Sequence, residues 1–349
     1  MASAKITCLC GAINVPLDDP LPAKSSLCHC NSCRHTSGAL FAGRIGPLEN
    51  IPDDHTLSAC TAYHSSSTTT RYFCSTCGAK LFIHDAGKNE WHTFAGVVDP
   101  PADLENVLDI QAHQGLADTH DGGMASFMTT LGGKTIPLYS TDASSPAYHL
   151  PEPKAQPLPD PHATLKAKCH CGGISLLIQR ARHDDPSIPQ LDRFIPKAED
   201  GTTPTNKHMA FCCTCRSCRL QTGVSSLVPW TYIPAAQILN AHTRQAVLQH
   251  HDVDNVGAAA DVNRDLTITH FWSSEKSCRS FCRVCGASAF YSTDSRPEVV
   301  NVAAGLLRGE EHDDGVMARG WLNWVWGRTA WRDEATQRDV ADAWRGTGG

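Results

Sequence analysis

The cysteines of this 349-residue chain are the residues best suited to chemistry, because most of them recur in one ordered pattern that appears twice. Each copy opens with Cys-x-Cys-Gly, continues with Cys-x-Cys-x-x-Cys-Arg and closes with Phe-Cys-x-x-Cys-Gly. The repetition predicts a tandem duplication. The cysteines of the pattern are Cys8, Cys10, Cys28, Cys30, Cys33, Cys74 and Cys77, then Cys169, Cys171, Cys213, Cys215, Cys218, Cys282 and Cys285.

The outer cysteine pairs of each copy form a set of four, which is the number of ligands that a structural zinc takes. All of these pairs end in Cys-Gly, and a glycine lets the backbone turn its amide groups toward thiolate sulfurs. We therefore expect two structural zinc sites. Their predicted ligands are Cys8, Cys10, Cys74 and Cys77 in the first copy and Cys169, Cys171, Cys282 and Cys285 in the second.

The inner cluster of each copy has three cysteines, a number that leaves zinc with an open position for chemistry. An arginine follows each cluster directly, which predicts a cation beside the thiolates and beside an anionic ligand. With both kinds of site, the chain is expected to bind four zinc ions. The predicted catalytic residues are Cys28, Cys30, Cys33 and Arg34 in the first copy and Cys213, Cys215, Cys218 and Arg219 in the second.

A fourth protein ligand would close a three-cysteine site and make its metal structural. The candidates are Cys60, Cys212, His208 and His29, of which Cys212 is sterically disfavoured because it adjoins Cys213. Soft sulfur ligands at this spacing favour zinc over iron as the metal.

Composition argues against several classes of protein. The chain has 30 basic and 36 acidic residues and no basic run, so we expect no nucleic-acid partner. No uncharged apolar segment approaches the roughly 18 residues of a membrane span, and no signal-peptide pattern opens the chain, so we expect a cytoplasmic protein without a membrane partner. Thiols stay reduced in that compartment, which favours metal binding over a disulfide scaffold.

The length suits two domains better than one. Residues 1–138 form the first predicted domain, 139–165 a proline-rich extended linker, and 166–349 the second domain with a tryptophan-rich tail. Comparison of the cysteine spacings indicates that the second copy carries two insertions, which we place at 182–206 and 249–264. Such insertions are either variable surface loops or loops that shape a substrate pocket.

Short apolar runs at 39–42, 80–83 and 93–98 are bounded by turn residues, which predicts short strands and a mainly β fold. Helical periodicity is scarce, apart from a short amphipathic helix expected at 333–345. The tail contains Trp321, Trp324, Trp326, Trp331 and Trp344. These side chains are expected in the core or between the two domains, and an aromatic wall of a substrate pocket is the alternative.

The ordered pattern of Cys-x-Cys-Gly, Cys-x-Cys-x-x-Cys-Arg-x-x-x-Gly and Phe-Cys-x-x-Cys-Gly resembles that of the glutathione-dependent formaldehyde-activating enzyme family, also called the centromere protein V family. The resemblance covers both copies and excludes the linker and the tail. It implies two tandem β-tent zinc domains built of coiled antiparallel sheets. In each, one zinc is structural and a second is held by the Cys-x-Cys-x-x-Cys cluster.

The resemblance also implies a carbon–sulfur lyase that acts on a thiol adduct such as S-hydroxymethylglutathione, so that the partner is a small thiol or thiol adduct. Carried over by position, Arg71 and Arg279 occupy matching places before the last cysteine pair. Our prediction is a zinc-dependent lyase for a glutathione-like adduct or a related specialised metabolite. The alternative is a non-catalytic binding module whose zinc ions are all structural.

The two copies are not identical around the inner cluster. The first has His29 within the cluster and a Gly96 to Pro100 turn, whereas the second has Thr214 and adds Cys212. Because nearby polar groups and pocket shape set specificity more than the metal does, we expect the two sites to differ in their ligands.

Overall fold

A computed structural model describes residues 4–152, 160–182, 194, 196–198, 202–203, 205–247, 263–312 and 314–346 of the chain. The predicted insertion at 249–264 lies almost entirely outside these residues, and so does most of the insertion at 182–206. Among the described residues, no helix has both the length and the apolar character needed to cross a membrane.

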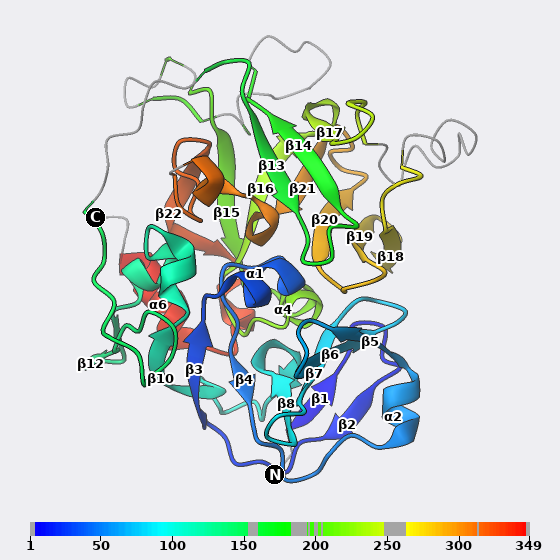
Figure 1. The fold of residues 1–349 in the computed structure, drawn as a ribbon, viewed down its shortest axis with the longest axis vertical. Coiled ribbons are helices and arrows are strands. Elements are labelled where there is room, and N and C mark those ends of the chain that lie inside the picture. The colour runs from blue at the N-terminus through cyan, green and yellow to red at the C-terminus, as the bar shows by residue number, and fades with distance from the viewer. Residues whose placement is uncertain are drawn as a thin grey trace.

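The described chain is mainly β, as predicted, and its strands form six small sheets. Figure 1 shows the first half of the chain, in blue and cyan, below the second half, in green to orange. The strands of the first half are β1 (Lys5–Thr7), β2 (Asn14–Pro16), β3 (Ala23–Cys28), β4 (Arg44–Ile45), β5 (Cys60–His64), β6 (Thr69–Cys74), β7 (Lys80–Asp85), β8 (Glu90–Phe94), β9 (Val98–Asp99), β10 (Leu108–Gln114), β11 (Thr130–Leu131) and β12 (Lys134–Thr135). Its helices are α1 (Asn31–Ser37), α2 (Asp54–Ser58) and the 3₁₀ helices η1 (Ala95–Val97), η2 (Leu116–Thr119) and η3 (Gly123–Phe127).

The second half contains a similar but not identical series of elements. Its strands are β13 (Thr164–Lys168), β14 (Ser175–Gln179), β15 (His208–Cys213), β16 (Val228–Pro234), β17 (Ile238–Asn240), β18 (Ile268–Ser274), β19 (Ser277–Cys282), β20 (Ser288–Thr293), β21 (Val299–Ala303) and β22 (Leu322–Ala330). Its helices are α4 (Arg216–Thr222), α6 (Arg338–Arg345) and the 3₁₀ helices η4 (Ala235–Gln237), η6 (Ala304–Leu306), η7 (Gly309–His312) and η8 (Arg332–Glu334).

The largest sheets of the two halves share a strand order, whereas the three-stranded sheets differ in which strand is central. The first half has a five-stranded sheet in the order β4-β8-β7-β6-β5, and the second has β16-β21-β20-β19-β18 within a seven-stranded sheet. Strand β3 pairs with β10, and its counterpart β15 pairs with β22, in parallel in both cases. The sheets are therefore not all antiparallel, in contrast to what the family resemblance implied.

Two of the three predicted strand runs differ in the structure. The run at 93–98 is divided into β8, η1 and β9. The break occurs where Gly96 meets the backbone of the other half, since its amide donates to the carbonyl oxygen of Gly223 at 2.9 Å. The run at 39–42 is buried but forms no strand, because only Ala42 pairs, in an isolated bridge with Cys28.

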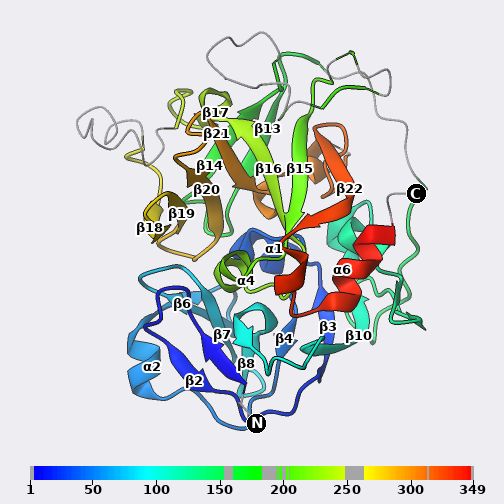
Figure 2. The ribbon, with the colours of Figure 1, turned by 180° about the vertical axis from the view of Figure 1, so that it is seen from behind.

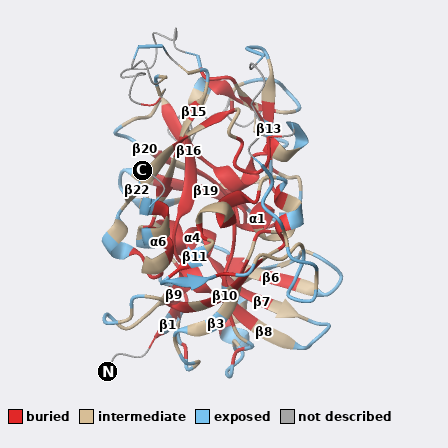
Figure 3. Ribbon diagram, turned by 90° about the vertical axis from the view of Figure 1, so that its left-hand side faces the viewer, coloured by how far each residue is buried: buried red, intermediate tan, exposed pale blue. Residues whose placement is uncertain are grey.

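The halves share one hydrophobic core, and Figure 3 shows buried segments running continuously through the centre of the molecule. The contacts between them are reciprocal. The Gly305 amide donates to Gly38 and the Gly96 amide donates to Gly223, both at 2.9 Å. Phe73 of the first half meets Phe281 of the second edge to face, with ring centroids 6.2 Å apart. Reciprocity of this kind is the property of an interface between two copies related by a twofold axis.

The two glycines that end α1 and α4 make this approach possible. Gly38 and Gly223 have positive φ values of 81° and 76°, the left-handed conformation that ends many helices. An added Cβ at Gly38 would lie 2.4 Å from the Ser288 carbonyl oxygen, and one at Gly223 would lie 2.9 Å from the Cβ of Lys80. Larger residues would therefore force the halves apart.

The C-terminal tail crosses back to the first half, where Figure 2 shows α6 beside β10. The Gln337 side chain both donates to and accepts from the backbone of Leu108. Phe127 of the first half packs against Trp326 and Trp344, which confirms the expected packing role for these two tryptophans. Trp331 is the exception, because its side chain is 67% exposed.

Candidate metal centres

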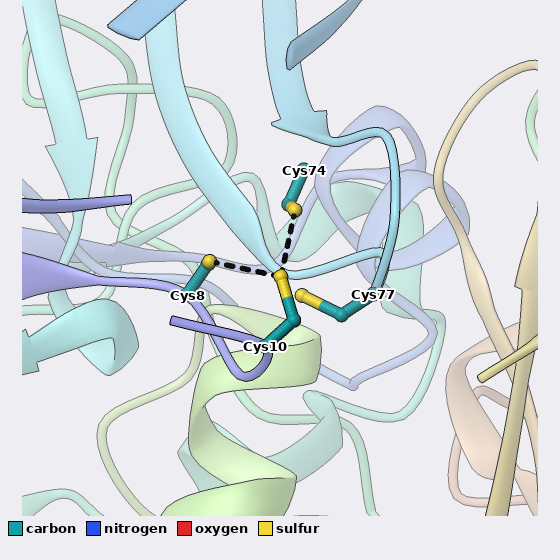
Figure 4. Close-up of side chains that lie close together, drawn as sticks. All are labelled: Cys8, Cys10, Cys74 and Cys77. Carbon is teal, nitrogen blue, oxygen red and sulfur yellow. Dashed lines mark hydrogen bonds between the residues drawn. The ribbon is translucent and has the colours of Figure 1, made fainter. Parts of the chain in front are cut away.

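The first group of four cysteines joins two distant segments. Cys8 and Cys10 follow β1, whereas Cys74 ends β6 and Cys77 lies in the turn before β7. Figure 4 shows the four sulfur atoms turned toward one another. The Cys8 and Cys10 sulfurs are 3.4 Å apart, and those of Cys10 and Cys74 are 3.6 Å apart. A tetrahedral zinc with Zn–S distances of about 2.3 Å places its sulfurs about 3.8 Å apart, so the group fits zinc.

The second group of four is built in the same way. Cys169 and Cys171 have sulfurs 3.5 Å apart, as do Cys171 and Cys282, and Cys285 completes the group. The Ile174 amide donates to the Cys169 sulfur at 3.2 Å, and the Ile13 amide does the same for Cys8. Backbone amides that point at thiolates stabilise their negative charge.

Lys80 lies between the two groups of four, a residue that sequence analysis did not single out. Its buried ammonium donates to the carbonyl oxygens of Gly78 at 2.7 Å, of Gln221 at 3.2 Å and of Gly286. Burial lowers the pKa of Lys80 to about 8, and the nearby cysteines of both groups oppose that shift. The sequence signal for this residue was a lysine at the start of the otherwise apolar run at 80–83. The matching residue of the second half is Ser288.

Each group of three cysteines lies where a strand passes into a helix. Cys28 ends β3, Cys30 is the N-cap of α1 and Cys33 is in the first turn of that helix. In the second half, Cys213, Cys215 and Cys218 occupy the same places on β15 and α4. The spacing of Cys30 and Cys33, with a glycine shortly after, was a signal for these helices that periodicity did not reveal.

No proposed fourth ligand joins these groups among the described residues. Cys60 donates to the Thr56 carbonyl, and the His29 ring is hydrogen-bonded to the His113 ring at 2.9 Å. His208 contacts the Gln179 carbonyl at 2.8 Å, and Cys212 is buried one residue before Cys213 on a strand, where successive side chains point to opposite faces. Both groups therefore keep three sulfurs, a number suited to a zinc with an open position.

The arginines that directly follow the clusters do not hydrogen-bond to a sulfur among the described contacts. Arg34 is buried and donates to the carbonyls of His29 and Asp118 and to the Asn31 side chain. Arg219 donates to the Gly96 carbonyl at 3.1 Å and lies 3.8 Å from Asp99. Their position supports the backbone of the site and does not bring a cation directly onto the thiolates.

Arg71 and Arg279 are the cations that contact sulfur. Arg71 donates through Nη2 to Cys33 Sγ at 3.5 Å, and Arg279 donates through Nη1 and Nη2 to Cys218 Sγ at 3.6 and 3.7 Å. The pKa of the Cys33 and Cys218 thiols is held well below its usual range, first by hydrogen bonds from the other cysteines of each cluster and then by these arginines. Each cluster thus has one thiolate stabilised by a buried cation.

Residues of the opposite half complete the surroundings of each cluster. Next to the first cluster, the His170 amide donates to the His35 carbonyl at 3.1 Å and the His170 ring is 2.7 Å from the Tyr63 hydroxyl. Burial lowers the pKa of His170, and the charges of Arg71 and Arg308 lower it further. Next to the second cluster, Asp99 of the first half pairs with Arg216 at 2.7 Å.

The fold and these sites define a mainly β protein with four cysteine groups that could hold metal ions. Residues 3–114 match the family model described as glutathione-dependent formaldehyde-activating enzyme. The match includes the seven patterned cysteines of the first copy and does not extend to the second. No curated protein and no solved structure matches the chain.

Proposed function

We propose that the chain is a zinc-dependent carbon–sulfur lyase-type enzyme that acts on a thiol adduct of the glutathione class. The observation that carries the proposal is the three-cysteine group, which has no fourth protein ligand among the described residues and lies beside a buried arginine within the segment that matches the family model. A structural zinc site would close with a fourth ligand, and the neighbouring four-cysteine group of the same half does so.

The sulfurs of each four-cysteine group would hold a structural zinc, and those of each three-cysteine group would hold a zinc with an open position. A zinc bound there would supply Lewis-acid activation of the thiol sulfur. The chain's own residues would stabilise negative charge at the cluster through Arg71 or Arg279, and the buried helices α1 and α4 would exclude water from one side of it.

The reaction joins a thiol to an aldehyde such as formaldehyde. In the forming direction the sulfur attacks the carbonyl carbon, a carbon–sulfur bond forms and the thiol proton passes to the aldehyde oxygen. In the reverse direction that bond breaks, its electron pair returns to sulfur, and the hydroxyl proton is lost as the aldehyde forms. The reaction consumes no oxidant and no reductant. The chain therefore needs only a site that stabilises the thiolate.

We also propose that residues 166–349 form a second domain of the same kind, and that the protein works in the cytoplasm, where free thiols are available. The repeated order of strands and of cysteine groups supports this assignment. The competing function is a non-catalytic binding module in which all metals are structural. The nearly complete burial of Cys218 favours it for the second half alone.

The test is exchange of ¹³C-labelled formaldehyde with S-hydroxymethylglutathione, followed by NMR exchange spectroscopy at equilibrium. We expect the zinc-loaded chain to accelerate exchange and Cys30→Ser, alone or combined with Cys215→Ser, to remove that acceleration. Cys60→Ser is the matched control, because this half-buried cysteine lies outside every metal group. Absence of acceleration for glutathione and for other small thiols would leave the binding module as the better function.

A further inference from the structure

The two arginines at the three-cysteine groups differ in their hydrogen bonds. Arg71 donates through Nε to the Ser65 hydroxyl at 3.1 Å and through Nη2 to the Cys33 sulfur. Its Nη1 is buried and has no hydrogen-bond partner among the described residues. Its residue as a whole is 8% exposed. A buried donor left unpaired costs about 1–3 kcal/mol, so an incoming acceptor would be stabilised by meeting it.

At the second site, the corresponding arginine nitrogen donates a hydrogen bond to a side chain of the protein. Gln221 Oε1 accepts from Arg279 Nη1 at 3.0 Å, so that both terminal nitrogens of Arg279 are engaged and only its Nε has no hydrogen-bond partner. Gln221 is three residues after Cys218, and Thr36 is the matching residue three after Cys33. The shorter Thr36 side chain donates to the Ser32 carbonyl of its own helix at 2.6 Å.

The accessibility of the two sites differs in the same direction. Cys33 is half-buried, and so are Tyr63, Ser65 and His170 around Arg71. Cys218 is buried, with 5% of its surface exposed. The last cysteine of the first cluster is therefore less buried than that of the second, whereas the other two cysteines of each cluster are half-buried.

Charged residues of the opposite half lie near both three-cysteine sites. Val98 and Leu307 each pair with the first strand of their own half. The next residue is Asp99 in the first half and Arg308 in the second. Asp99 lies 3.8 Å from Arg219 at the second site. The charge of Arg308 acts on His170 beside the first site, where Glu310 lies 3.8 Å from Arg34. Carboxylates pair favourably with guanidinium groups in such buried surroundings.

We propose that the first three-cysteine site binds small thiols that carry a carboxylate, that Arg71 is the specificity-determining residue that recognises this carboxylate, and that Gln221 excludes it from the second site. The inference rests on the proposed function and names the substrate class of the first site. The second site then binds thiols without regard to a carboxylate.

The test uses the full chain with cobalt(II) in place of zinc, whose visible spectrum reports thiols that join the coordination shell. Cys215→Ser leaves only the first three-cysteine site, and Cys30→Ser leaves only the second. Two probes are compared in each, 3-mercaptopropionate, which has a carboxylate, and 2-mercaptoethanol, which has none. The ratio of their two Kd values cancels most of the intrinsic affinity of the thiol.

We expect the first site to favour 3-mercaptopropionate by about tenfold or more, the size of one charge-assisted hydrogen bond. Arg71→Gln should bring the ratio close to one, and Thr36→Gln should do the same by supplying the amide found in the second half. Gln221→Thr in the Cys30→Ser chain should create a carboxylate preference at the second site. The cobalt bands of the four-cysteine groups and the circular dichroism serve as controls for folding.

Equal ratios at the two sites, or an unchanged ratio in Arg71→Gln, would overturn the proposal while leaving the proposed function intact. Should Arg71→Gln fail to fold, Thr36→Gln decides the matter, because it leaves Arg71 in place. Absence of any spectral response to either thiol at either site would reject the proposed function together with the inference.

Discussion

The two halves of this molecule have the same construction and differ at the points where each reaches into the other. Both place three cysteines at a strand-to-helix junction and one arginine on the last sulfur. In the first half, Nη1 of Arg71 has no hydrogen-bond partner among the described residues. In the second half, Nη1 of Arg279 donates to Gln221. Under the inference above, two sites with the same set of cysteines differ in ligand recognition through one residue three positions after the last cysteine.

A second difference lies on the axis between the halves. Both four-cysteine groups are built alike, but the Lys80 ammonium donates to the carbonyl that follows each group, at Gly78 and Gly286, whereas the hydroxyl of its counterpart Ser288 donates to the Gln221 carbonyl. One ammonium fits where two would collide. The reciprocal contacts therefore cannot be perfectly symmetric, and the residue on the axis must differ between copies.

The largest expected effect comes from the four-cysteine groups. A structural zinc contributes about 10–16 kcal/mol in zinc-finger peptides, against a net domain stability of about 5–15 kcal/mol. Cys77→Ser or Cys285→Ser should therefore abolish cooperative folding. Because the halves share one core, we expect each variant to disrupt the whole chain, whereas Cys30→Ser should stay folded. Thermal melting followed by circular dichroism checks this, and equal melting of both kinds of variant would show that the cysteines are wrongly divided.

The next effect compares the two three-cysteine groups. We expect Cys30→Ser to lower turnover of a glutathione adduct more than about 100-fold, since groups that merely orient a metal ligand already contribute roughly 10–100-fold. Cys215→Ser should have a much smaller effect, because Gln221 already accepts the Arg279 hydrogen bond that a carboxylate of the thiol would need. Initial rates of both variants with the same adduct give the comparison. Losses near half from each, additive in the double variant, would mean that the sites are equivalent.

A smaller effect on stability is expected at Lys80, which lies between the two four-cysteine groups. Lys80→Met leaves three buried carbonyl oxygens without this donor, which should lower the free energy of unfolding by about 2–4 kcal/mol. Lys166→Met is the matched control, because Lys166 is exposed and its ion pair with Glu311 is worth at most about 1 kcal/mol. Urea denaturation of both variants measures the difference. A Lys80 variant as stable as the control would remove the role assigned to the axis.

The smallest effect concerns two acidic residues, one in each half. Asp314 of the second half is buried, which raises its pKa to about 6, while Glu105 of the first half forms an exposed ion pair with Arg338. The folded state binds the Asp314 proton more tightly than the unfolded chain does. This contribution to stability is present below about pH 4 and is lost as the pH rises to about 6.

Asp314→Asn cannot titrate, so the stability of the wild type relative to this variant should fall between about pH 4 and about pH 6. We expect a change below about 1 kcal/mol once solvent screening is counted. Melting temperatures of the two proteins in the same buffers measure it, and Glu105→Gln serves as the control. A relative stability that rises across this range would contradict the sign.

The sequence alone determined the grouping of the cysteines, because ligand number and spacing are local properties of the chain. The Cys-Gly pairs identified both four-cysteine groups, and the Cys-x-Cys-x-x-Cys clusters identified both groups of three. Short apolar runs between turn residues were likewise enough for a mainly β fold. The run at 80–83 became part of β7 as expected.

Only the tertiary structure decided which cation meets which sulfur. Arg34 is next to Cys33 in the chain, yet the helix turns its side chain toward the backbone of His29, and Arg71 arrives from another strand. The run at 93–98 was broken by a contact with Gly223 that lies far away in the sequence. Such contacts depend on how two halves with a common core pack together, and no local pattern of residues encodes that packing.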